Sequence, residues 1–170
     1  MIIFLIGFMG SGKSTLGKRL AKKISWDFMD MDKELEAQEG MPVERIFEEK
    51  GEEYFRQKES ELLHKLNSER NAVIATGGGA PCYDDNMEVM NSKGVTVYLR
   101  MHECSLTSRL EKARIVRPLI QGLETEELRT YIRKKLDERE PYYNQAHCII
   151  KGESVKPDHI IALVFGNTNP

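Results

Sequence analysis

Residues 7–14 read Gly-Phe-Met-Gly-Ser-Gly-Lys-Ser and match the pattern G-x-x-x-x-G-K-[ST] in full. The match follows an apolar run at residues 2–6 and leads into a helical pattern over residues 14–23. Glycines let backbone N–H groups curl around phosphate oxygens, and the positive end of the following helix points at the same anions. Because glycine makes up only about 7% of average sequences, a chance match is rare. We therefore expect a nucleotide-binding loop and not a ligand-free glycine turn.

The rest of the chain alternates between strand and helix patterns. Strands are expected at residues 2–6, 26–30, 72–76, 95–99 and 147–150. Helices are expected at residues 14–23, 43–50, 52–66, 103–112, 125–139 and 158–165. Such alternation is typical of one α/β domain with a mainly parallel sheet. We expect residues 1–170 to form that single domain.

The composition is that of an ordinary globular protein, with 40% apolar residues, 31% charged residues and a net charge of −2. This charge gives no overall attraction to nucleic acid or to an anionic membrane, so neither is expected as a partner. Three widely spaced cysteines without a C-x-x-C pair argue against a disulfide framework or a zinc site. We expect a cytoplasmic protein. We also expect a monomer, because the sequence has no coiled-coil pattern that would demand a partner.

The nucleotide loop predicts which groups contact the phosphates. Lys13 is expected to reach the β- and γ-phosphates, and the Ser14 hydroxyl is a ligand for Mg²⁺. The nucleotide-binding residues at the loop are expected to be Gly10, Ser11, Gly12, Lys13, Ser14 and Thr15.

The acidic residues that could serve the metal and the attacking hydroxyl lie after the second expected strand, as Asp30 and Asp32. The other apolar strands end in Thr76 and Arg100, so they supply no acid. Alternation along an extended chain would point Asp30 and Asp32 to one side, one near the metal and one near an attacking hydroxyl. The alternative is that one of them caps a helix beginning at Lys33. Beside a nucleotide loop without another acid, the functional interpretation is favoured.

Several motifs occur in a fixed order along the chain: the loop at residues 7–15, Asp30-Met31-Asp32, Phe55-Arg56-Gln57-Lys58-Glu59, Gly77-Gly78-Gly79, Arg117-Pro118-Leu119 and Arg139-Glu140-Pro141-Tyr142-Tyr143. With these motifs the sequence resembles the shikimate kinases over nearly its whole length. The resemblance implies a three-layer P-loop NTPase fold: a central five-stranded parallel sheet flanked by helices, a substrate-binding helical segment (residues 31–62) and a mobile lid (residues 110–123).

The resemblance also implies roles for the acids and arginines. Asp32 is implied to contact the substrate hydroxyls and to be the candidate base, while Asp30 holds Mg²⁺ through water. Arg56 and Arg139 are implied to clamp the substrate carboxylate, and Arg117 to close over the ATP phosphates. A guanidinium fork matches a carboxylate in two parallel bonds.

Further substrate contacts are expected around these arginines. Glu59 lies three residues after Arg56 on a helix and is placed to hold it. The backbone of Gly77, Gly78 and Gly79 is implied to touch the substrate ring hydroxyls, because glycine permits close approach.

On the adenine side the sequence departs from the family. Leu110 and Val155 occupy positions where arginine is common, and Arg109 and Arg114 are the nearby cations assigned to the nucleotide.

The implied reaction transfers the γ-phosphoryl group of ATP to the 3-hydroxyl of shikimate, on the route to chorismate and the aromatic amino acids. The catalytic residues would be Asp32, Lys13 and Arg117. Another small-metabolite kinase, such as a gluconate kinase, and an inactive nucleotide-binding protein are the alternatives.

Overall fold

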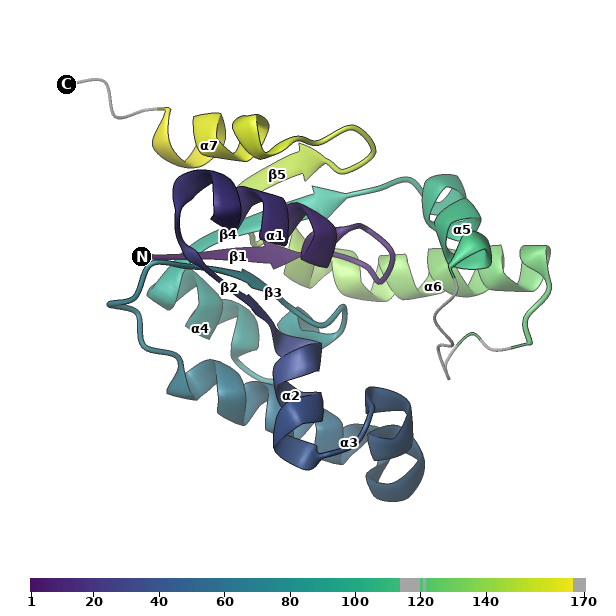
Figure 1. The fold of residues 1–170 in the computed structure, drawn as a ribbon. Helices are drawn as coiled ribbons and strands as arrows, with labels where there is room; N and C mark the ends of the chain where they lie inside the picture. Colours follow the sequence, from purple (N-terminus) through teal and green to yellow (C-terminus); the bar gives the residue numbers. More distant parts are fainter. Residues whose placement is uncertain (114–119, 121, 167–170) are drawn as a thin grey trace.

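The computed structural model describes residues 1–113, 120 and 122–166. Its centre is a five-stranded sheet in the order β2-β3-β1-β4-β5, in which every pair is parallel (Figure 1). The strands are β1 Ile2–Ile6, β2 Asp27–Asp30, β3 Ala72–Ala75, β4 Gly94–Arg100 and β5 Cys148–Lys151. The expected five-stranded parallel α/β fold is confirmed.

Helices cover both faces of the sheet, which explains the unbroken apolar sequence of β1. All five residues of β1 are buried, with Ile3 and Leu5 in the cluster under α1 and α7 and Phe4 in the opposite cluster. Figure 1 shows α1 and α7 on one face and α3 and α4 on the other. The helices are α1 Lys13–Ile24, α2 Met31–Glu39, α3 Val43–Lys65, α4 Asn86–Lys93, α5 Glu103–Lys112, α6 Thr125–Tyr143 and α7 Pro157–Phe165, with a 3₁₀ turn at Ala80–Cys82. None of these is long and apolar enough to cross a membrane.

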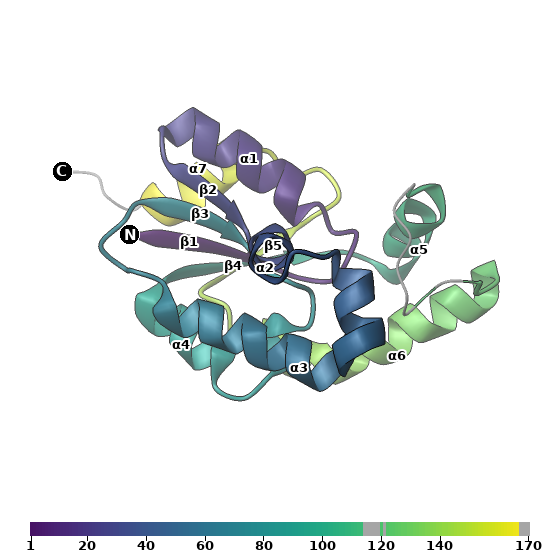
Figure 2. The same cartoon turned by 60° about the horizontal axis from the view of Figure 1, so that its bottom comes forward.

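Helix α3 is bent where the sequence predicts two separate helices. Gly51 has φ 84° and ψ 166°, outside the helical region, and helix resumes at once on its far side. The bend is visible in Figure 2, where the first part of α3 stands across the remainder. The expected break at Gly51 is therefore present, but no separate loop divides the two parts.

Three helices differ from the sequence-based expectation. Helix α2 is expected only in the alternative interpretation of Asp30 and Asp32, as a helix from Lys33, and it begins two residues earlier. Helix α4 was not predicted, because it carries no regular apolar stripe and buries the polar Asn86 beside Met87 and Met90. Helix α6 runs through Pro141 to Tyr143 and not to residue 139. Proline removes one backbone hydrogen bond, but Tyr143 is fully buried and anchors the last turn in the core.

The parallel topology brings three chain segments to one edge of the sheet. The nucleotide loop follows β1, Asp30 ends β2, and Gly77 follows β3 by two residues. In open α/β sheets ligands bind at this carboxyl-terminal edge. The nucleotide loop, Asp30 and the glycine run therefore meet at this edge.

The start of β4 supplies a stability prediction. Gly94 pairs with Ile2 of β1, and an added Cβ would overlap the Ile2 carbonyl oxygen and lie 2.9 Å from its carbon. Because both partners are backbone, Gly94→Ala should lower the free energy of unfolding by about 1–3 kcal/mol. Urea unfolding measures it, and a change below about 0.5 kcal/mol would contradict this packing.

Candidate active site

The nucleotide loop adopts a backbone that requires its glycines. Gly7, Gly10 and Gly12 have φ of 139°, 81° and 93°, a region that residues with a Cβ rarely adopt. Lys13, at the start of α1, is buried, and its ammonium donates to the carbonyls of Gly7 at 2.7 Å and Phe8 at 2.9 Å. The loop thus wraps around its own lysine at the N-terminus of a twelve-residue helix, an arrangement suited to an anion.

Asp30 links the end of β2 to this loop. The Ser14 hydroxyl donates to the Asp30 carboxylate at 2.5 Å, and the same carboxylate accepts from the Lys33 backbone N–H at 3.4 Å as the cap of α2. Asp30 therefore caps α2, as the alternative interpretation predicts. It also lies beside Ser14, where the metal-binding interpretation needs it.

The expectation that Asp30 and Asp32 alternate along an extended chain is wrong. Helix α2 begins at Met31, so Asp32 lies in its first turn. Both carboxylates nevertheless line the same cavity, because the strand-to-helix turn brings Asp32 round to the side of Asp30. Asp30 and Ser14 offer the oxygen donors that Mg²⁺ prefers.

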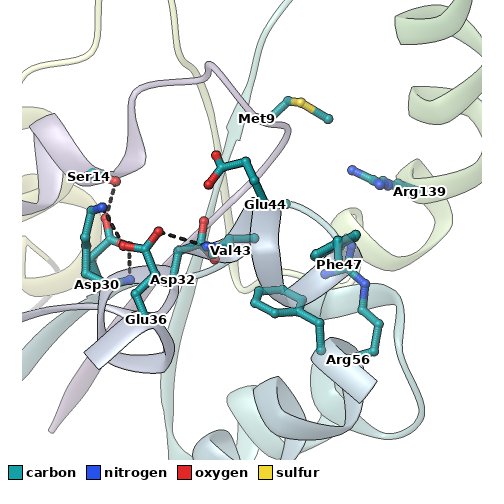
Figure 3. Close-up of a pocket in the computed structure, with 15 residues that line it drawn as sticks. Met9, Ser14, Asp30, Asp32, Glu36, Val43, Glu44, Phe47, Arg56 and Arg139 are labelled. Carbon is teal, nitrogen blue, oxygen red and sulfur yellow. Dashed lines mark hydrogen bonds and ion pairs between the residues drawn. The ribbon is translucent and has the colours of Figure 1, made fainter. Parts of the chain in front are cut away.

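The cavity beside the loop has a volume of about 250 Å³. Figure 3 shows Asp30, Asp32 and Glu36 on the side of Ser14, Arg56 and Arg139 on the other side, and Glu44 between the two. The full lining is Met9, Ser14, Asp30, Asp32, Lys33, Glu36, Val43, Glu44, Phe47, Phe55, Arg56, Gly77, Gly78, Gly79 and Arg139. Such a cavity suits a ligand with one anionic end and one hydroxyl-bearing end.

Arg56 is held in the cavity wall by two glutamates of its own helix. One Nη contacts the Glu59 carboxylate, and the other donates to Glu52 at 3.1 Å. Glu59 has no solvent exposure, and its Oε1 has no hydrogen-bond partner among the described residues. Burial raises the pKa of Glu59 to about 7; Arg56 opposes this shift, and the Asp32 charge adds to it.

The three glycines after β3 lie in crowded surroundings, Gly77 and Gly79 against these two side chains and Gly78 against the nucleotide loop. A Cβ on Gly77 would overlap Glu59 Oε1, and one on Gly79 would lie 2.5 Å from the Arg56 guanidinium carbon. At Gly78 the added atom would lie 3.1 Å from the Met9 nitrogen. The glycine run thus lets α3 and the nucleotide loop approach the same backbone.

Arg139 reaches the cavity from α6. Its guanidinium lies 5.3 Å from the centre of the Phe8 ring, within cation–π range. Gly78 is its backbone neighbour, since a Cβ there would lie 3.5 Å from Arg139 Nη1. Arg56 and Arg139, 83 positions apart in the sequence, are thereby placed at one cavity.

On the nucleotide side, Arg109 bridges two loops. Its guanidinium donates to the carbonyls of Gly10 at 3.4 Å, Ser11 at 3.3 Å and Glu153 at 3.5 Å. Leu110 is buried beside Gly10, where it packs in an apolar cluster with Phe8. Arg114 and Arg117, with half of the expected lid (residues 114–119 and 121), lie outside the described residues.

Several residues that line the cavity were not predicted. Phe47 and Phe55 lie on the apolar stripe of α3, with Phe55 in the core cluster and Phe47 packed against it, and both also line the cavity. Lys33, Glu36 and Glu44 occur among many other charged residues, so no sequence pattern separated them from a solvated helix face.

Comparison with known proteins agrees with this geometry. The family model described as shikimate kinase matches residues 9–166. A curated shikimate kinase of Parabacteroides distasonis is 43% identical over 153 residues, covering 90% of this chain and 88% of that protein.

Two solved structures extend the similarity to three dimensions. Shikimate kinase of Bacteroides thetaiotaomicron superposes with a TM-score of 0.91 at 41% identity, covering 96% of this chain and 97% of that one. The Acinetobacter baumannii enzyme in complex with shikimate gives a TM-score of 0.90 at 33% identity, covering 99% of this chain and 95% of that one. With the nucleotide loop, the paired acids and the two arginines assembled at one cavity, this chain belongs to the shikimate kinase family.

Proposed function

We propose that this chain uses the cavity at the sheet edge to transfer the γ-phosphoryl group of ATP to the 3-hydroxyl of shikimate. The products are ADP and shikimate 3-phosphate, on the route to chorismate and the aromatic amino acids. The observation that carries this proposal is the division of the cavity into an acidic side next to Ser14 and a basic side at Arg56 and Arg139.

The basic side binds and orients the substrate. Arg56 and Arg139 bind its carboxylate, and two guanidinium forks on one carboxylate fix its direction. Phe47 and Phe55 offer apolar surface to the ring, while the backbone of the three glycines contacts its hydroxyls. Such positioning places the hydroxyl at the opposite end, near Asp32.

The acidic side and the nucleotide loop carry out the transfer. Asp32 orients the attacking hydroxyl and accepts its proton. Residues 10–15 bind the nucleotide phosphates, and Lys13 balances charge on the transferred group. Arg109 lies beside the nucleotide loop, and we assign it to nucleotide binding together with Arg114 and Arg117.

Mg²⁺ is the expected metal, with Ser14 and Asp30 as its residues, Asp30 acting through water. When bound, it neutralises charge on the β- and γ-phosphates. Within the described ranges no three His, Cys, Asp or Glu side chains form a metal-binding cluster. This fits a magnesium ion that takes one or two protein ligands and completes its shell with phosphates and water.

The remaining expectations concern the whole molecule. We assign residues 1–170 to one domain, with residues 31–62 as the substrate-binding segment and residues 110–123 as a lid. Closure of that lid excludes water, which would otherwise accept the phosphoryl group. The working form is a cytoplasmic monomer.

The reaction is tested through Lys13. Lys13→Ala should reduce kcat at least about 100-fold, because a buried cation at the transferred charge is lost. A coupled ADP-release assay measures it, with Lys22→Ala on the exposed side of α1 as the control. Near-normal activity of Lys13→Ala would refute the mechanism.

The same assay on shikimate, gluconate and nucleoside monophosphates should give turnover with shikimate alone.

The carboxylate clamp is tested through Arg139. Arg139→Lys replaces a planar fork by a point charge, so the KM for shikimate should rise about tenfold or more, with a smaller effect on the KM for ATP. Arg129→Lys, on the same helix and paired with Glu103, is the control. An unchanged shikimate KM in Arg139→Lys would remove Arg139 from the clamp.

The buried carboxylate gives a pH prediction. The pKa of Glu59 is about 7 in the folded state against an ordinary 4.5, so its contribution to stability is fully present below pH 4.5 and is lost as the pH rises to about 7. Between pH 4.5 and 7.5, wild type should therefore lose on the order of 2–3 kcal/mol relative to Glu59→Gln. Urea unfolding across this range measures the difference, and parallel stability curves would disprove the shift.

A further inference from the structure

A pair of buried tyrosines lies behind the glycine run. Tyr143, the last residue of α6, and Tyr98, in the middle of β4, are both almost without solvent exposure. Their ring centres are 4.9 Å apart with planes inclined by 40°. Despite this common environment, the two hydroxyls differ in their bonding.

The Tyr143 hydroxyl donates to the Gly78 carbonyl at 2.5 Å. The Tyr98 hydroxyl is equally buried but donates to no backbone carbonyl of the described residues; its polar neighbour is the Arg100 guanidinium. Burial raises the pKa of Tyr143 far above its ordinary value, so this hydroxyl keeps its proton and remains a donor at neutral pH. One tyrosine of the pair therefore bonds the glycine backbone, and the other does not.

The bonded carbonyl belongs to the peptide that joins Gly78 to Gly79. The carbonyl and the following N–H lie on opposite edges of a planar trans peptide, and the described chain has no cis peptide bond. A carbonyl directed at Tyr143 therefore directs the Gly79 N–H away from Tyr143. Because Gly78 and Gly79 line the substrate cavity, the peptide between them presents its donor to one side and its acceptor to the core.

Glycine peptides need such a restraint. With no Cβ on either side, the Gly78–Gly79 peptide can rotate through conformations that other residues do not reach. Tyr143 lies four residues after Arg139, so both side chains leave the same face of α6. One helical turn thereby carries a guanidinium to the cavity and a hydroxyl to the peptide next to it.

We propose that Tyr143 is a positioning residue that fixes the Gly78–Gly79 peptide with its N–H toward bound shikimate and so sets the affinity for that substrate. The inference rests on the proposed function. It assigns Tyr143 no part in nucleotide binding or in phosphoryl transfer, because its hydroxyl is bonded to the Gly78 carbonyl and its charged neighbour is Arg139.

The chain offers a matched pair of variants for the test. Tyr143→Phe and Tyr98→Phe each remove one buried hydroxyl and keep the ring packing. Without its donor the Gly78–Gly79 peptide is free to turn, and the substrate loses about one hydrogen bond. In Tyr143→Phe, the KM and the calorimetric Kd for shikimate should therefore rise about 5- to 10-fold. The KM for ATP and kcat should stay within about twofold, and all four values should be unchanged in Tyr98→Phe.

Three outcomes would overturn the proposal. They are an unchanged shikimate Kd in Tyr143→Phe, an equal rise in the KM values of both substrates, or an equal effect of Tyr98→Phe. The ¹⁵N-labelled Gly79 amide gives a second readout that does not depend on turnover: shikimate should shift its NMR signal in wild type and Tyr98→Phe, and much less in Tyr143→Phe. If the wild type phosphorylates no shikimate, the proposed function fails; if it does and the variants behave alike, only this inference fails.

Discussion

The buried pair formed by Arg56 and Glu59 is the interaction on which the substrate side of the cavity depends. A carboxylate without solvent exposure is costly unless a cation lies against it, and losing one partner of such a pair typically costs 3–5 kcal/mol. The pair also fills the space above the glycine run, which is why Gly77 and Gly79 have no room for a Cβ. The Arg56 guanidinium that lines the cavity is thus held by packing and charge.

The sheet then determines where this pair lies relative to the nucleotide loop. Strand β3 pairs with β1 on one side and with β2 on the other, so the segments after all three strands end side by side. The loop after β1 supplies a cluster of backbone N–H groups and a lysine, the end of β2 supplies acid, and the residues after β3 supply bare backbone. Each strand end contributes a different chemical group, and the proposed phosphoryl transfer uses all three.

The parts of the fold and of the cavity that could be predicted are those with a short-range pattern in the sequence. The nucleotide loop and the strands were predictable because glycine spacing and apolar runs are short-range patterns. The extended path assumed for Asp30 to Asp32 was wrong because α2 begins one residue after the strand, and a β-to-helix boundary has no sharp signal in the sequence. The cavity-facing role of Phe47 could not be predicted, since an apolar residue on a helix stripe has the same pattern in a core and in a binding site.

The family departure at Leu110 has a local physical explanation. Successive residues of a helix point about 100° apart, so neighbouring positions on α5 serve different surroundings. Leu110 turns inward to pack against Gly10 and Phe8, while Arg109 extends along the outside of the loop to the carbonyls of Ser11 and Glu153. A cation at position 110 would have to enter an apolar cluster, at the cost of burying its charge. The positive group next to the nucleotide loop therefore sits one residue earlier, where it joins the loop to the segment after β5.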